Sequence, residues 1–260
     1  MYGPEQRLPL IRAALARGIP RLRVFQPHEH ELLLVCAGPN VRGEIDNIRR
    51  LHDENHPILA VKGAHDFLYD HGIVPEMAIA VDPQPHTVKY FQRHDDKTLY
   101  LLASQCPIEL FDLLEGHRMR LFHCAGPTTA DALREYAEGN PVESEHVTVA
   151  GGSSSGLRAF NIAYLLGFRM LHIFGMDSSL GPDRLRKVNG EQLDPEKDII
   201  HMTVGDRTFE TCGAFAAQAS EFQDILERMG DLKVKCYGDG LIPAIARHRA
   251  ETTECKQCLI

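Results

Sequence analysis

The stretch from residue 147 to 177, VTVAGGSSSGLRAFNIAYLLGFRMLHIFGMD, decides the fold. It reads as a short strand, a glycine and serine turn, an amphipathic helix and a second strand that ends in a carboxylate. Gly151 and Gly152 lack Cβ atoms, so the backbone can turn sharply out of the first strand, and Ser153 and Ser154 bring hydroxyls to the helix start. The N–H groups and the positive dipole at such a helix end favour an anion, so this turn is a candidate phosphate-binding element.

The same residues also make ordinary turns between a strand and a helix that bind nothing. GGSSSG is not a P-loop, which would need a Lys after its last Gly, and it is not the GxGxxG dinucleotide fingerprint. The motif therefore does not assign a cofactor, and a nicotinamide-dependent dehydrogenase is disfavoured.

Short apolar runs alternate with helical segments along the rest of the chain. This spacing predicts an α/β fold with a Rossmann-like, doubly wound and mostly parallel sheet. The predicted strands are residues 32–37, 58–64, 77–85, 98–104, 119–124, 147–150 and 170–174, and residues 233–240 are predicted to form a final strand and turn. The predicted helices are residues 8–17, 43–52, a short helix through residues 67–69, 108–114, 129–137, the segment between the two strands of the opening stretch, and 214–229.

No low-complexity linker divides the chain, so we expect a single domain with appendages. Residues 1–31 form an N-terminal helical extension, residues 32–250 the nucleotide-binding transferase domain, and residues 251–260 a flexible tail. Residues 178–204 are polar and aperiodic, and this insertion is either a surface excursion or a lid over the site.

The composition is that of a soluble globular protein, with 43% hydrophobic and 25% charged residues. A formal net charge of -8 gives no electrostatic footprint for nucleic acid, which favours a small-molecule or nucleotide substrate. No segment resembles a membrane span or a secretory leader, so we expect a cytoplasmic protein and leave homo-oligomer formation open. The seven cysteines are dispersed and are read as mostly buried thiols, and the lone CxxC of Cys255 and Cys258 is either half of a zinc site or part of a reduced tail.

Glycines and polar residues follow one predicted strand after another. Ligands of open α/β sheets bind at the carboxyl ends of the strands, so these residues are the candidate site. They are Gly38, Pro39, Asn40, Gly63, Asp82, Gly151, Gly152, Ser153, Ser154 and Asp177.

Asp82 and Asp177 are the candidate catalytic carboxylates. A carboxylate at a strand end can hold Mg²⁺ against a diphosphate, orient a ribose or act as a base, and Asp82 is the candidate metal ligand. The alternative for both is a cap on the next turn or helix. His201 is the third catalytic candidate, because a loop beyond the last site strand could bring its imidazole over the ligand.

The ordered set of motifs CAGPNV, GIVPEMAIAVDPQ, GGSSSGLRAFNIAYLLGFRMLHIFGMDSS, GDRTFETCGAF and KCYGDGLIPAI resembles a known domain. It is similar to the domain shared by 6-hydroxymethylpterin diphosphokinase-like proteins and flagellin motility accessory factor (Maf) proteins, over residues 32–245. Bacterial CMP-sialic acid sialyltransferases look distantly similar. The resemblance implies a Rossmann-like domain that binds a nucleotide and catalyses a transfer.

Within this resemblance the first loop matches at Gly38, Pro39 and Asn40, and the second glycine turn matches at residues 151–153. Asp82 matches the acid after the third strand, and Asp177 matches the acid after the last site strand. Two departures concern the donor: Asn40 stands where the family usually has Ser, and Glu76 follows Pro75 where the family usually has Asp.

The resemblance implies one of two reactions. The preferred one is transfer of a diphosphate from ATP to a hydroxymethylpterin-like molecule, with Mg²⁺, because the chain lacks the large flanking regions of the accessory factors. The alternative is a glycosyltransferase that uses a CMP-activated nonulosonic (sialic-type) sugar. A third hypothesis, from another class, is a nucleotide-binding module without catalysis.

Overall fold

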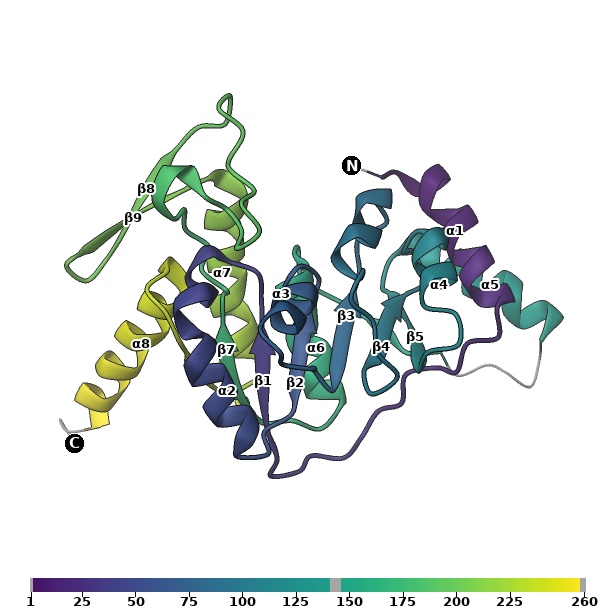
Figure 1. The fold of residues 1–260 in the computed structure, drawn as a ribbon, viewed down its shortest axis with the longest axis horizontal. Coiled ribbons are helices and arrows are strands. Elements are labelled where there is room, and N and C mark those ends of the chain that lie inside the picture. Colours follow the sequence, from purple (N-terminus) through teal and green to yellow (C-terminus); the bar gives the residue numbers. More distant parts are fainter. Residues whose placement is uncertain (1, 141–145, 258–260) are drawn as a thin grey trace. The chain divides into compact units, whose positions relative to one another are not determined.

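The computed structural model describes residues 2–140 and 146–257. Over these residues the chain is an α/β fold with an eight-stranded, mostly parallel sheet, an N-terminal helix and a small late antiparallel hairpin (Figure 1). The strand order is β10-β7-β1-β2-β3-β4-β5-β6, and the hairpin is β8-β9. This architecture confirms the predicted fold class.

The sheet strands form from the short apolar runs. β1, β2, β3 and β4 are almost wholly buried, as expected of parallel strands that are covered by helices on both faces. The strands are β1 (Glu31–Val35), β2 (Ile58–Val61), β3 (Met77–Ala80), β4 (Leu99–Ala103), β5 (Met119–Cys124), β6 (Thr148–Val149), β7 (Met170–Phe174), β8 (Ile200–Val204), β9 (Arg207–Thr211) and β10 (Lys233–Cys236).

The helices occupy most of the segments between these strands. The α-helices are α1 (Pro4–Ala16), α2 (Ile45–Asp53), α3 (Ala64–Asp70), α4 (Ile108–Leu113), α5 (Pro127–Gly139), α6 (Ser155–Leu165), α7 (Gly213–Arg228) and α8 (Leu241–Gln257). The short 3-10 helices are η1 (Pro39–Glu44), η2 (Pro85–Tyr90) and η3 (Pro182–Arg184).

The chain divides into two compact units. The first unit comprises Met1–His28 and Leu59–Gly167. In it α1 packs against α4 and α5 and buries Ile11, Ala14 and Leu15. The chain after α1 then runs beside β5, where the Leu22 N–H donates to the Leu121 carbonyl at 2.8 Å.

The second unit comprises Glu29–Ile58 and Phe168–Ile260. In it β7 lies between β1 and β10, and all three strands are parallel. The hairpin β8-β9 stands off these strands beside α7 (Figure 1). The hairpin was not predicted, because residues 178–204 are polar and have no strong period, and α8 was not predicted either.

Several predicted boundaries need correction. β5 and β7 have the predicted bounds, whereas Ala64, predicted in a strand, is the first residue of α3. The predicted strand 77–85 ends at Ala80, because the prolines after Asp82 lead into η2. The predicted strand 147–150 is only two residues long.

The structure describes the C-terminal segment as far as Gln257 and the surroundings of five of the seven cysteines. Helix α8 continues to Gln257, and Cys258 lies outside the described residues. Four of the five cysteines whose surroundings the structure gives are buried free thiols, which agrees with the prediction, and Cys236 is half-buried. Among the helices of residues 2–140 and 146–257, none is long and apolar enough to cross a membrane.

Candidate functional site

The strand order has a switch point at β1. From β1 the chain builds outward through β2 to β6, and it then returns to place β7 on the other side of β1. Open α/β sheets bind their ligands outside the carboxyl ends of the strands at such a point. The loops that follow β1 and β7 both belong to the second unit, and they carry the predicted Gly38, Pro39, Asn40 and Asp177.

Asp177 and the first loop are joined directly. The Asn40 N–H donates to Asp177 Oδ2 at 2.9 Å, and the Gly38 N–H donates to the Gly175 carbonyl at 2.8 Å. Pro39 begins η1, where its fixed φ suits a helix start and its missing N–H costs nothing. Asp177 therefore holds the first loop in place through a main-chain hydrogen bond.

Two glycines are required by the close approach of the backbone to Asp177. A Cβ on Gly38 would overlap Asp177 Oδ2 and the Gly175 carbonyl oxygen, and a Cβ on Gly240 would lie 2.6 Å from Asp177 Cα. No side chain fits in either place. Packing around Asp177 thus explains Gly38 of CAGPN and Gly240 of YGDG, whether or not they also contact a ligand.

Burial dominates the electrostatics of Asp177. The residue is 2% exposed, and desolvation raises the pKa of its carboxyl to about 6, against the lowering effect of the hydrogen bonds from Asn40. The nearby Glu44 raises it further. Asp177 Oδ1 is buried without a hydrogen-bond partner, so this oxygen is available to a donor group that the protein chain does not supply.

Residues from later motifs fix the segment after Asp177. The Ile242 N–H donates to the Asp177 carbonyl at 3.2 Å, and the Leu241 N–H donates to Ser179 Oγ at 3.3 Å. Thr211 Oγ1 donates to the Ser178 carbonyl at 2.8 Å. The motifs around residues 211 and 241, which contributed to the resemblance, therefore support the position of Asp177.

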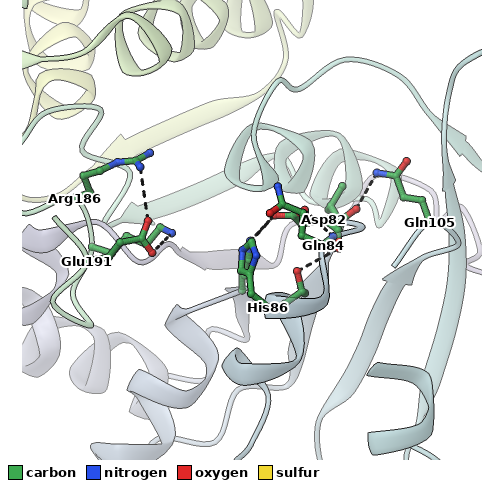
Figure 2. Close-up of polar contacts among 10 residues, drawn as sticks. Asp82, Gln84, His86, Gln105, Arg186 and Glu191 are labelled. Carbon is green, nitrogen blue, oxygen red and sulfur yellow. Dashed lines mark hydrogen bonds and ion pairs between the residues drawn. The ribbon is translucent and has the colours of Figure 1, made fainter. Parts of the chain in front are cut away.

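The polar insertion packs on the first loop within the same unit. The Val188 N–H donates to the Ala37 carbonyl at 2.9 Å, and Arg42 Nη2 donates to the Val188 carbonyl at 2.6 Å. Within the insertion Glu191 lies 3.7 Å from Arg186 Nη1, a pair that Figure 2 shows. The insertion is therefore held by contacts within itself and by hydrogen bonds to the first loop.

A second polar cluster, in the first unit, surrounds Asp82; we call Lys62, Asp82, Gln84 and His86 the Asp82 cluster. Lys62 directly follows β2 and Asp82 closely follows the neighbouring β3, so both lie at carboxyl ends of parallel strands. Lys62 Nζ is 2.6 Å from Asp82 Oδ2, and the Gln84 N–H donates to Asp82 Oδ1 at 3.1 Å. Figure 2 shows Asp82 among these contacts.

His86 extends the cluster toward solvent. Its Nε2 lies 3.4 Å from Lys62 Nζ and 3.8 Å from Asp82 Oδ2, and its side chain is 39% exposed. Lys62 Nζ also lies 5.2 Å from the centre of the Tyr90 ring, a cation–π distance. Gln105 lies just after the next strand, β4, and its Nε2 donates to the Val81 carbonyl at 2.8 Å, which fixes the backbone before Asp82 (Figure 2).

The ammonium group keeps Asp82 ionised. Burial by itself raises the pKa of the Asp82 carboxyl, but Lys62, the Gln84 N–H and His86 together hold it below its ordinary value. The cluster thus offers an ionised carboxylate, a cation and an imidazole at one strand end. Such a group can position a hydroxyl and neutralise a phosphate.

The residues around Asp82 do not form a protein Mg²⁺ site. The one carboxylate is engaged by Lys62, and the described residues contain no group of three or more His, Cys, Asp or Glu side chains that could hold a metal. Mg²⁺ is usually held by one or two carboxylates together with phosphate oxygens and waters, so Asp82 by itself supplies at most part of its ligand set. The metal role predicted for Asp82 gains no support from the geometry, and we assign no step to a metal.

The glycine and serine turn has a structural role in the first unit. Ser154 is the N-cap of α6, and its Oγ accepts from the Leu157 N–H at 3.3 Å. Arg158 Nη1 and Nη2 donate to the Val149 and Gly152 carbonyls at 2.6 and 3.0 Å. A Cβ on Gly152 would lie 2.6 Å from the Arg158 backbone N. Phosphate binding by residues 151–154 remains a prediction.

The turn and the Asp82 cluster are separated in the sheet. β6 lies three strands from β3, and strands are spaced by about 4.8 Å, so the two strand ends are about 14 Å apart across the sheet. A residue of the turn therefore does not contact Asp82, although an extended nucleotide is long enough to span that distance.

The positions of two other candidate site residues, Gly63 and His201, give no support for a functional role. Gly63 precedes α3 with φ of -63°, a conformation that any residue adopts. His201 lies in β8 with a side chain that is 63% exposed, and its Nε2 is 3.8 Å from Glu210 Oε1. Their functional roles remain predictions.

Sequence reasoning did not identify three polar residues of these clusters. Lys62 stands between a buried strand and Gly63, where a cation has no packing role. This unusual position is the sequence signal from which Lys62 could have been identified. His86 is four residues after Asp82, within the turn that the prolines create. Arg158 follows the GGSSSG motif but reads as one more polar residue on a helix.

Comparison with known proteins agrees with this architecture. A Maf glycosyltransferase from Magnetospirillum magneticum AMB-1 matches 98% of this chain with a TM-score of 0.66 and 13% sequence identity. This chain spans 42% of that chain. At that identity the likeness concerns the fold alone.

Two sialyltransferases are more weakly similar. A mammalian sialyltransferase in complex with Gal-beta-1-3GalNAc-ortho-nitrophenol has a TM-score of 0.44 and 9% identity, and the match covers 88% of this chain and 78% of that one. The sialyltransferase CstII from Campylobacter jejuni, in complex with CMP-3FNeuAc, has a TM-score of 0.42 and 12% identity, with 82% and 83% covered. No curated protein matches the sequence.

The sequence also matches a protein-family model, described as 6-hydroxymethylpterin diphosphokinase MptE-like, over residues 12–182. That range holds β1 to β7, the first loop, the Asp82 cluster and Asp177. The family and the similar structures are transferases by description. Since the match covers well over half of its length, the chain belongs to the family described as 6-hydroxymethylpterin diphosphokinase MptE-like.

Proposed function

We propose that this protein is a nucleotide-dependent transferase that moves a diphosphate from ATP to the hydroxyl of a hydroxymethylpterin-like molecule. The family match supports the reaction class. The Lys62–Asp82 pair at adjacent strand ends is the single observation that carries the proposal, because it combines an ionised carboxylate with a cation at 2.6 Å.

The reaction requires little covalent chemistry from the protein. The acceptor hydroxyl oxygen forms a bond to the β-phosphorus of ATP, the bond from that phosphorus to the oxygen bridging the α-phosphate breaks, and AMP leaves with the electron pair. Asp82 orients the hydroxyl and receives its proton, while Lys62 neutralises charge on the transferred group. Phosphoryl transfer depends mainly on such positioning and charge stabilisation.

The first loop has a separate role in the proposal. Its position at the switch point between β1 and β7 is where open α/β sheets bind nucleotides. Asp177 holds the main-chain N–H of Asn40 in this loop. Asp177 is then a positioning residue of the loop, since it is only 2% exposed.

A second candidate is a glycosyltransferase that uses a CMP-activated nonulosonic sugar. The observation that favours it is the fold similarity to the Maf glycosyltransferase over 98% of this chain. In this reaction the acceptor hydroxyl attacks the anomeric carbon and CMP leaves. Asp82 would again be the base, so the two candidates differ in donor and acceptor rather than in the polar cluster.

Ligand-dependent unfolding temperature separates the two candidates. A donor present at about 100 times its Kd stabilises the folded state by about 2.7 kcal/mol, which corresponds to an increase of roughly 5 to 10 °C in Tm for a chain of this size. We expect this increase with ATP and Mg²⁺ and a smaller one with CMP or CTP. A larger increase with CMP and none with ATP would exclude diphosphate transfer from ATP.

Product analysis tests catalysis itself. With ATP and a 6-hydroxymethylpterin acceptor, mass spectrometry should detect AMP and the acceptor diphosphate in equal amounts. ATP binding without either product would support the hypothesis of a nucleotide-binding module without catalysis.

A further inference from the structure

We propose that Glu31, His172 and Tyr237 form a hydrogen-bonded relay that positions the loops after β1 and β7 for the nucleotide; we call these three residues the cross-strand relay. The inference rests on the proposed function, because it assumes that the nucleotide binds at those loops. All three residues belong to the second unit. Glu31 begins β1, His172 lies in the middle of the neighbouring β7, and Tyr237 directly follows β10 on the other side of β7.

The relay is continuous through one imidazole ring. His172 Nε2 lies 2.6 Å from Glu31 Oε2, and His172 Nδ1 lies 2.8 Å from the Tyr237 hydroxyl oxygen. The hydrogen bond from His172 holds the pKa of the Glu31 carboxyl below its ordinary value against the effect of burial, so Glu31 is ionised and can only accept. In the neutral ring Nε2–H therefore donates to Glu31, and Nδ1 accepts from the Tyr237 O–H.

Tyr237 is attached to β7 by its ring as well as by its hydroxyl. The centre of the ring lies 4.3 Å from that of Phe174 at an interplanar angle of 12°, and Lys235 Nζ lies 5.3 Å from the same ring centre. The Tyr237 N–H also donates to the Ile173 carbonyl at 2.9 Å. The relay therefore fixes the point at which the chain leaves β10.

The backbone that follows Tyr237 packs on both loops of the candidate site. A Cβ on Gly238 would lie 3.3 Å from Asn40 Cβ in the first loop, and a Cβ on Gly240 would lie 2.6 Å from Asp177 Cα. Because these contacts leave no room for a side chain, a small displacement of Tyr237 is transmitted to both loops.

His172 is the polar exception in its strand. β7 reads MLHIF, and His172 is 6% exposed, so an apolar side chain would be the ordinary choice at this position. A buried polar network costs desolvation that apolar side chains of similar volume do not, and such a network can fix one arrangement without adding stability. The property that the relay fixes is the position of the segment after Tyr237.

Calorimetric titration with ATP and amide hydrogen exchange measured by NMR test the proposal on the full chain. Tyr237→Phe removes the hydroxyl and keeps the stacked ring, and it should raise the Kd for ATP about fivefold, because one hydrogen bond no longer fixes the segment. The Ile242 N–H, which donates to the Asp177 carbonyl, should exchange faster. His172→Leu should have both effects while the free energy of unfolding in urea stays equal or rises.

Tyr69→Phe is the matched control. It removes a tyrosine hydroxyl that lies 2.8 Å from Thr98 Oγ1 in the first unit, so it reproduces the loss of one such hydrogen bond elsewhere in the protein. We expect it to change neither the Kd for ATP nor the exchange of the Ile242 N–H.

With ATP bound by the unmodified protein, the inference is overturned if Tyr237→Phe leaves either the Kd or the Ile242 exchange unchanged, or if Tyr69→Phe has equal effects. Absence of ATP binding to the unmodified protein would instead reject the proposed function. The Ile242 exchange would then decide by itself whether the relay positions this segment: faster exchange in Tyr237→Phe alone supports it, and unchanged exchange rejects it. Tyr237→Phe keeps the test valid if His172→Leu does not fold.

Discussion

Asp177→Asn tests the buried carboxylate at the switch point through the pH dependence of stability. Raising the pKa of a carboxyl from 3.8 to about 6 corresponds to about 3 kcal/mol, because one pKa unit is about 1.4 kcal/mol. Between these pH values the folded protein binds more protons at Asp177 than the unfolded chain does. Stability from this group is therefore highest below pH 3.8 and is lost as the pH rises through about 6.

Asparagine cannot ionise, so the variant does not undergo this loss. The side-chain carbonyl oxygen of the asparagine can still accept from the Asn40 N–H. Any cost of burying the NH₂ group of its side chain does not depend on pH. We expect the unfolding free energy of the variant, minus that of the unmodified protein, to become more positive by about 2 to 3 kcal/mol from about pH 4 to about pH 7.

Urea denaturation at several pH values measures this difference. Asp53→Asn, which removes an exposed carboxylate from α2, shows what the loss of a surface charge does to the same slope. A difference between Asp177→Asn and the unmodified protein that stays constant across the pH range would refute the account of Asp177 as a buried, desolvated carboxylate.

Three further predictions concern single contacts. Lys62→Met should raise the pKa of Asp82, because burial then acts without the ammonium that opposes it, and NMR titration of the carboxyl carbon checks this; an unchanged pKa would contradict the ion pair. Gly38→Ala should destabilise the protein by about 1 to 3 kcal/mol in urea denaturation, since the added Cβ overlaps Asp177, whereas Gly43→Ala meets no atom within 4 Å and should not; equal effects would show that the packing argument is wrong. Ser154→Ala should cost about 1 kcal/mol through loss of the N-cap of α6, and Ser154→Asp should retain it; a failure of Asp to restore stability would argue against capping.

The fold could be predicted from the sequence because its strands are short, apolar and buried on both faces. Runs such as LLLV and LYLLA have no other stable place than the interior of a parallel sheet. Glycines and prolines then marked the turns. The prediction failed where tertiary contacts decide the structure, as in the hairpin β8-β9, whose residues are mostly exposed or half-buried.

The candidate site could be predicted only as a set of strand ends. Asp82 and Asp177 look alike in sequence, since each follows an apolar run. The structure separates them: Asp82 pairs with Lys62 in a half-exposed cluster, and Asp177 is buried against a glycine backbone. This difference depends on residues far away in the chain, such as Gly240, and no local pattern contains it.

The measurement that tests the central claim most directly is AMP formation from ATP with a 6-hydroxymethylpterin acceptor, compared between the unmodified protein and Asp82→Asn. Removal of a base that positions the attacking hydroxyl should lower kcat by about 10² to 10⁴, while the Kd for ATP changes little. Turnover by Asp82→Asn at the rate of the unmodified protein would contradict the assignment of Asp82 and the transfer site built around it.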